Sequence, residues 1–243
     1  MNKYLLVKTG MHRVICCFIS AIALCAGMIC RADDYSINVG DFSKLKLVGK
    51  VNVTYTPSAT EHGVVKFTCD KEVASKIMCQ NTKNTLRIEV DVLTLPQGCK
   101  LPDLTVYSSN LEYAENSSDS TLTVTGIIPG SRFQGKLIGN GTMILNNIDT
   151  YRLDASISTG CGHMIINGKA TKAKLTNVGT GPFEANGLSV EEATCWIIGT
   201  GPIDCHVLNT LKIYGAGSGT VYYTGSPAKI INRTLGVKVV NVK

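Results

Sequence analysis

Gly139-Asn-Gly-Thr-Met-Ile-Leu-Asn146 is followed 21 residues later by Gly160-Cys-Gly-His-Met-Ile-Ile-Asn167, and this repetition decides the fold. Each stretch opens with a G-x-G triplet and continues into apolar residues. Six such triplets stand in register, with Ser-Asp-Ser in place of the first, at spacings of 21, 21, 19, 20 and 18 residues. They begin at Ser118, Gly139, Gly160, Gly179, Gly199 and Gly217. A period of about 20 residues is typical of a solenoid, in which each repeat stacks on its neighbours.

The residues after each triplet repeat too. Two positions past the triplet stand Leu122, Met143, Met164, Phe183, Ile203 and Val221, and four positions past stand Val124, Leu145, Ile166, Ala185, Cys205 and Tyr223. The column between them reads Thr123, Ile144, Ile165, Glu184, Asp204 and Tyr222. Alternation of this kind is the pattern of a strand with one buried face. The sequence therefore predicts an all-β, parallel β-solenoid of about six short rungs.

A polar column follows, five positions past the triplet. Its members are Thr125, Asn146, Asn167, Asn186, His206 and Thr224. Identical positions of stacked rungs lie about 4.8 Å apart. We therefore expect the asparagines to form a hydrogen-bonded ladder at a bend, while the glycines occupy turns that exclude a Cβ.

The region before the repeats also has strand-like patterning. Alternating or β-branched segments predict strands at 44–47, 51–55, 64–68, 86–92 and 104–107, and 72–78 is the one candidate for a short helix. We divide the chain into an N-terminal β region, 33–110, and the rungs, 111–243, which most simply form one continuous domain.

The first 32 residues read as a secretory signal. Lys3, Lys8 and Arg13 precede an apolar run over 14–29, which is shorter than the roughly 20 residues of a membrane-spanning helix. We place cleavage after Ala32, with lipidation of Cys25 or Cys30 as the alternative. Cleavage lowers the net charge from +6 to +2, so the composition does not indicate nucleic-acid binding. The predicted location is the periplasm, the outer-membrane surface or the extracellular space.

Six cysteines follow the signal: Cys69, Cys79, Cys99, Cys161, Cys195 and Cys205. In an exported chain an even number permits disulfides, and Cys69 with Cys79 is the expected pair. No C-x-x-C pair occurs, and the histidines after the signal lie at no ligand-like spacing, so a zinc site is not predicted. A Cys-His nucleophile is also disfavoured, because Cys205 and His206 are adjacent in a strand and point to opposite faces.

Three stretches resemble one bacterial family. They are Phe42-Ser-Lys-Leu-Lys-Leu-Val-Gly-Lys-Val-Asn-Val53, the recurring triplets, and Gly217-Ser-Gly-Thr-Val-Tyr-Tyr-Thr-Gly-Ser-Pro227. The family is the putative auto-transporter adhesin head, or GIN domain, a domain of unknown function common in Bacteroidetes. The resemblance implies a right-handed β-helix-like fold and export to the envelope or surface, and it supplies no catalytic residues. Ser118-Asp-Ser120 and the number of cysteines depart from the family pattern.

Glu184 and Asp204 form the candidate chemical site. They occupy equivalent outward positions on consecutive rungs, so their carboxylates should lie close together. Such a pair could share a proton, bind Ca²⁺ or act as an acid and base on a glycan, and it could equally be two solvated acids. Aromatic residues near the last rungs could form a binding platform or could cap the core: Trp196, Tyr214, Tyr222 and Tyr223.

We expect a non-enzymatic envelope or surface protein that binds a glycan or an envelope or host protein. The binding candidates are Glu184, Asp204 and Tyr222, and no metal or catalytic residue is assigned. The alternatives are a structural envelope scaffold and a carbohydrate-active β-helix enzyme. The enzyme would need a groove with several convergent carboxylates, and the sequence offers one pair.

Overall fold

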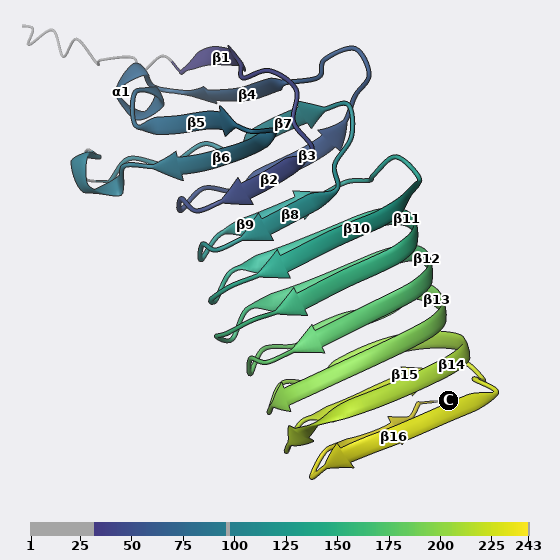
Figure 1. Cartoon of the computed structure of the whole chain (residues 1–243). Helices are drawn as coiled ribbons and strands as arrows, with labels where there is room; N and C mark the ends of the chain where they lie inside the picture. Colours follow the sequence, from purple (N-terminus) through teal and green to yellow (C-terminus); the bar gives the residue numbers. More distant parts are fainter. Residues whose placement is uncertain (1–31, 96–97, 243) are drawn as a thin grey trace, which may run out of the picture. The chain divides into compact units, whose positions relative to one another are not determined.

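The computed structural model describes residues 32–95 and 98–242. The predicted signal peptide, residues 1–32, therefore lies outside the described residues except for Ala32. The described residues form one compact unit that is almost entirely β-structure (Figure 1). Its strands belong to a single hydrogen-bonded sheet that bends so that it has two outer faces around one core. No helix among the described residues is long and apolar enough to cross a membrane.

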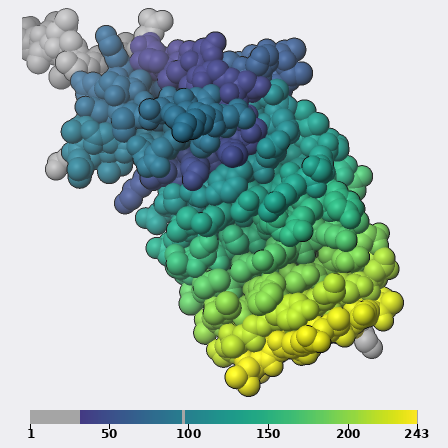
Figure 2. Space-filling model, viewed as in Figure 1, coloured from purple at the N-terminus to yellow at the C-terminus, as the bar shows by residue number. Residues whose placement is uncertain are grey.

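Four long strands carry the architecture: β11 (Thr142–Ile157), β12 (His163–Asn177), β13 (Phe183–Gly199) and β14 (Ile203–Gly217). Each runs along one face, bends near its middle and continues along the other face, and each pairs in parallel with the next. The six predicted triplets lie at the turns that join one rung to the next. The structure thus confirms a β-solenoid of about six turns, whose later rungs appear as parallel bands in Figure 2.

Shorter strands extend both faces at each end of the long strands. One face continues through β10 (Gly130–Leu137), β8 (Tyr113–Asn116), β2 (Lys44–Leu47), β6 (Thr85–Val90) and β5 (Ile77–Thr82), and at the other end through β16 (Lys229–Leu235). The other face continues through β9 (Thr121–Val124), β3 (Val53–Pro57), β7 (Leu104–Ser108), β4 (Val64–Cys69) and β1 (Asp33–Asn38), and at the other end through β15 (Thr220–Thr224) and β17 (Lys238–Asn241).

The core lies between the two faces and is built from the predicted apolar columns. Met143, Met164 and Phe183 are fully buried, and so are Leu145 and Ile166. The strand alternation places the residues between them outside. Burial of these columns is the main favourable contribution to folding, since each buried large apolar side chain contributes about 1.5–3 kcal/mol.

Two turn glycines show why the triplets are needed. Gly160 has φ of +83°, and a Cβ there would lie 2.4 Å from the carbonyl oxygen of Gly139 in the rung before. A Cβ on Gly181 would lie 2.0 Å from the carbonyl oxygen of Gly162. Both glycines are required because the turns stack backbone on backbone.

The predicted asparagine ladder exists only in part. Asn167 Nδ2 donates to Asn146 Oδ1 at 2.9 Å. The register then shifts, so that Asn167 lies opposite Gly187 instead of Asn186. The prediction of a continuous ladder was wrong at this point, because the bend of β13 contains extra residues. Buried Asn177 has the more important bonding role: its Nδ2 donates to Gly181 O and to Pro202 O, both at 3.0 Å.

The N-terminal region joins the same faces, but out of chain order. The β2–β3 rung lies between β6–β7 and β8–β9, although β6 and β7 follow it in the sequence. Strands from the two sides of the predicted boundary at residue 110 thus hydrogen-bond to each other: β2 pairs with β8, and β3 pairs with β9. The predicted helix over 72–78 is shorter than expected: α1 covers Lys71–Ala74, and β5 begins at Ile77. A 3₁₀ turn, η1 (Val92–Thr94), follows β6.

The predicted Cys69–Cys79 disulfide is not formed, and all six cysteines among the described residues are free thiols. Cys69 lies opposite Asp33 of β1, whereas Cys79 lies opposite Ile88 of β6, so the two are not cross-strand partners. Burial also raises the pKa of Cys79 to about 11. Its thiol is therefore protonated at neutral pH and is a poor nucleophile for disulfide exchange.

Candidate functional site

The three candidate residues occupy one outward column on the face that contains β15. Glu184 of β13 lies opposite Asp204 of β14, which lies opposite Tyr222 of β15. From β9 to β17 the column reads Thr123, Ile144, Ile165, Glu184, Asp204, Tyr222 and Val240. We call this surface the Glu184 face. This part of the column contains neither lysine nor arginine.

Burial and one another's charge set the electrostatics of this pair, and one histidine lies beside it. Desolvation and the neighbouring charge of Glu184 raise the pKa of Asp204. His163 Nε2 is shielded from solvent and lies 2.9 Å from Glu184 Oε1, in a geometry that does not make a hydrogen bond. Because His163 approaches Glu184 from the preceding rung, the two acids do not share one partner. The arrangement is a histidine, a carboxylate and a second carboxylate that retains its proton more readily than usual.

The Glu184 face does not fit a calcium ion. Within the part of the chain that the structure describes, no group of three or more acidic, histidine or cysteine side chains is placed to hold a metal. Ca²⁺ takes six to eight oxygen ligands, and two carboxylates supply too few. Beside the pair is an open depression of about 320 Å³, lined by residues that include Asn186, Asp204 and Tyr222. This is a small surface for recognition of an extended partner.

A different chemistry covers the opposite face of the same rungs. Three outward columns run across β10 to β14 there, and we call this surface the Lys174 face. The columns are Arg132, Arg152, Lys172, Glu192 and Thr210; Gln134, Asp154, Lys174, Thr194 and Lys212; and Lys136, Ser156, Thr176, Trp196 and Tyr214. Six of the fifteen side chains are basic and two are acidic. The face carries a net charge of +4, whereas the whole chain from residue 33 carries +2.

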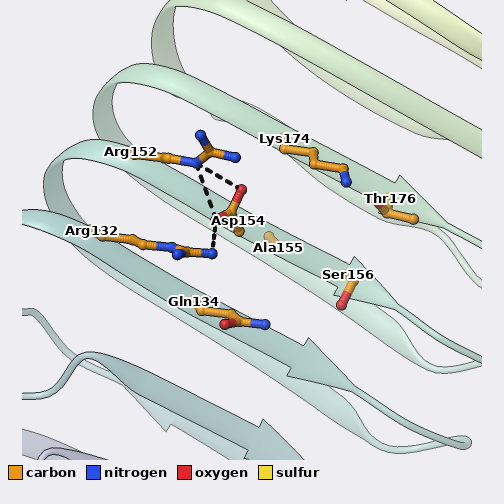
Figure 3. Close-up of a pocket in the computed structure, with 8 residues that line it drawn as sticks. All are labelled: Arg132, Gln134, Arg152, Asp154, Ala155, Ser156, Lys174 and Thr176. Carbon is orange, nitrogen blue, oxygen red and sulfur yellow. Dashed lines mark hydrogen bonds and ion pairs between the residues drawn. The ribbon is translucent and has the colours of Figure 1, made fainter.

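Two arginines converge on one acid in this face. Arg132 Nη2 lies 2.7 Å from Asp154 Oδ2, and Arg152 Nε lies 3.2 Å from the same oxygen. Figure 3 shows both guanidinium groups directed at the Asp154 carboxylate, with Lys174 on the neighbouring strand. These residues line a depression of about 220 Å³. One carboxylate cannot neutralise two guanidinium groups and a lysine, so positive charge remains.

The aromatic residues predicted to cluster are divided between the two faces. Trp196 and Tyr214 stack on the Lys174 face, with ring centroids 5.0 Å apart. Lys174 Nζ lies 5.8 Å from the centroid of the Trp196 ring, a cation–π arrangement. Tyr222 belongs to the Glu184 face, and Tyr223 packs against the core. The four rings therefore do not form one platform, because adjacent strand residues and successive strand halves face different sides.

The sequence contained a signal for the Lys174 face that was not used. Arg132, Arg152 and Lys172 recur at intervals of 20 residues, which is the rung period. The alignment of repeats stopped five residues past each triplet, whereas these cations lie in the second half of each rung. The basic columns of this face were accordingly not among the predicted features.

Residues 41–227 match the family described as "Putative auto-transporter adhesin, head GIN domain". The chain belongs to this family. The match covers both faces of the GIN domain and most of the described rungs, and it confirms the resemblance that the triplets and the two flanking stretches indicated.

Solved structures share the fold of this GIN domain. A putative adhesin from Bacteroides fragilis NCTC 9343 is 21% identical, with 87% of this chain and 97% of that chain covered at a TM-score of 0.77. A putative adhesin from Parabacteroides merdae ATCC 43184 is 20% identical, with 88% of this chain and 97% of that chain covered at a TM-score of 0.69. A putative lipid binding protein from Parabacteroides distasonis ATCC 8503 is 17% identical, with 88% of this chain and 97% of that chain covered at a TM-score of 0.68. At these identities the likeness shows the fold alone. No curated protein matches the sequence.

Proposed function

We propose that this GIN domain is a non-enzymatic, exported envelope or surface protein that binds an external partner through the Lys174 face, as an adhesin does. Family membership supports the surface role, since the family and several solved neighbours are described as putative adhesins. The observation that carries the binding site is the set of three outward columns with six basic side chains and a stacked aromatic pair.

The outward columns are not needed to hold the rungs together. The buried columns and the turn glycines do that, so outward side chains are free to be selected for a partner. A rigid sheet holds these side chains at fixed spacings and so reduces the ordering cost of binding. Exposed polar and aromatic residues concentrated on one face are typical of a recognition surface.

The test compares the two faces of the purified mature protein on an array of host and bacterial glycans and matrix proteins. One variant combines Arg152→Ala, Lys174→Ala and Lys212→Ala. The matched variant on the other face combines Glu184→Gln, Asp204→Asn and Tyr222→Ala. We expect the first to lose the array signal and the second to retain it, with circular dichroism checking that both fold. Loss in the second variant alone would return the site to the Glu184 face.

Two other roles have separate readouts. A structural envelope scaffold would co-purify with envelope proteins and would give no saturable array binding. A carbohydrate-active enzyme would show glycan cleavage that Glu184→Gln abolishes. Saturable binding without cleavage is the result that our proposal requires.

A further inference from the structure

The depressions of the Lys174 face join into one trough. The depression of about 220 Å³ shares Arg132 and Gln134 with a second, of about 640 Å³, that reaches Lys44 and Lys46 of β2. It shares Arg152 and Lys174 with a third, of about 310 Å³, that reaches Lys212 of β14. From β2 to β14 there are six strand spacings, or about 29 Å. A trough of this length along the stacking axis suits a chain molecule better than a compact ligand.

Several cations in the trough lack a carboxylate partner. Among the described residues, ion pairs are present for Arg132 and Arg152 but for none of Lys172, Lys174 and Lys212. Arg152 and Lys172 lie directly opposite each other on adjacent strands, where like charges are destabilising. An anionic ligand would relieve this repulsion, because it would place negative charge between rows of cations.

The other lining groups indicate a ligand rich in hydroxyl groups. Gln134, Ser156, Thr176 and Thr194 offer neutral hydrogen-bonding groups along the trough. Glu112, Asp154 and Glu192 interrupt the cations, and carboxylates accept hydrogen bonds from hydroxyls. A nucleic acid has a phosphate at every residue, and these three acids would repel it. A saccharide chain with intermittent charge would meet both kinds of group.

The aromatic pair completes the surface at the β13–β14 end. Trp196 is 37% exposed and stacks on Tyr214 beside Lys174 and Lys212. An exposed ring next to cations gives a flat apolar surface for the carbon face of a pyranose, while the ammonium groups bind its charged substituents. A lipid headgroup would use the cations and would leave this ring surface without a contact.

We propose that the Lys174 face binds a linear acidic polysaccharide along the stacking axis, with its sulfate or carboxylate groups on the lysines and arginines and a sugar ring against Trp196. This rests on the proposed function and names its ligand class. Sulfate and carboxylate both satisfy the cations, so the two sources are distinguished by the probes and not by the geometry.

The experiment measures binding of the mature protein by biolayer interferometry to heparin, fully desulfated heparin, alginate and neutral dextran. Single-stranded oligo(dT) and anionic phospholipid vesicles serve as the other polyanions. We expect heparin or alginate to bind saturably, with affinity that falls as salt rises, and dextran not to bind. If the protein still binds desulfated heparin and alginate, carboxylate groups are sufficient for binding. If it binds neither of them but binds heparin, sulfate groups are required.

A pair of charge-matched variants assigns the binding to the trough. Lys174→Gln with Lys212→Gln should weaken binding to the acidic polysaccharide about tenfold or more. Lys169→Gln with Lys238→Gln removes the same charge outside the trough and should leave binding within about twofold. Trp196→Ala should weaken binding at high salt as well as at low salt, since ring stacking is not screened.

Several results would overturn the inference. They are equal binding of dextran, tighter binding of oligo(dT) or vesicles than of any polysaccharide, equal weakening by the two lysine pairs, or no binding by any probe. If the protein then binds a neutral glycan or a matrix protein on the array through the Lys174 face, the proposed function stands without this ligand class. If the array is silent too, both fail.

Discussion

The Glu184 face and the Lys174 face are built from the same rungs, yet they differ in almost every outward property. Strand halves on each side alternate core and surface residues, and the same turns set their spacing. From β9 to β17 one outward column holds Glu184 and Asp204 with no lysine or arginine, while the other surface holds six basic side chains and a stacked Trp–Tyr pair. The core and turns therefore fix the scaffold, and the outward columns are free to differ.

The two faces also differ in how far along the stacking axis their interacting side chains extend. On the Glu184 face the notable contacts are confined to neighbouring rungs, where His163 meets Glu184 and Glu184 affects Asp204. On the Lys174 face similar side chains recur over many rungs, so that adjacent depressions share residues. Repetition along the axis is what an extended partner can use, and this is the physical reason for assigning recognition to the Lys174 face.

The stacked glycine turns set the distance between rungs on both faces, so a substitution that separates the turns should destabilise both faces together. This is the largest effect that we predict. Gly181→Ala would place a Cβ 2.0 Å from Gly162 O, so adjacent turns must separate. We expect a loss of about 1–3 kcal/mol in the free energy of unfolding, measured by urea denaturation. Gly130→Ala is the control, because its Cβ would lie 3.5 Å from its nearest neighbour. Equal stability of the two variants would contradict tight stacking of the turns.

The sequence predicted the features that repeat immediately after each turn. Phe183 and Ile203 were expected in the core and are fully buried, because a period-2 pattern beside a fixed turn leaves one register. The place of β2–β3 between β6–β7 and β8–β9 was not predictable in this way, since pairing order is a long-range property. The break in the asparagine ladder arises at Gly187, where a local register shift outweighs the repeat.

The site was predicted less well than the fold, for a related reason. Glu184 and Asp204 were placed together correctly by repeat register. The cations of the Lys174 face recur just as regularly but lie in the second strand half, beyond the aligned positions. His163 is one column away from Glu184, and no pattern in a single column could show that contact.

An intermediate effect should distinguish the aromatic residues of the two faces. Trp196 and Tyr222 are nearly equally exposed, at 37% and 38%, but within the described part of the chain only Trp196 stacks on another ring, that of Tyr214. We expect Trp196→Ala to lower the free energy of unfolding by about 1 kcal/mol more than Tyr222→Ala does, as measured by urea denaturation. A larger loss for Tyr222→Ala would mean that the Trp–Tyr stack does not stabilise its face.

The smallest effect that we predict concerns Asp204, and it is a gain in the free energy of unfolding where the other substitutions cause a loss. Its pKa is raised above the ordinary value of 3.8, so between the unfolded and folded pKa values the folded state binds more protons. Stability therefore falls as pH rises through this window, because charged Asp204 is desolvated beside Glu184. Asp204→Asn removes that charge and should raise the free energy of unfolding at neutral pH by about 0.5 kcal/mol.

The pH dependence of this variant tests the cause. The gain from Asp204→Asn should be largest at neutral pH and should vanish below the ordinary pKa of 3.8, where Asp204 is protonated in both states of the wild type. Lys174→Gln on the other face should show no gain that disappears over the same acidic range. A gain in the free energy of unfolding that does not change with pH would mean that packing causes the effect. A loss of stability at neutral pH would show that a partner stabilises the charged carboxylate, and Glu184 and Asp204 would then again be candidates for a binding site.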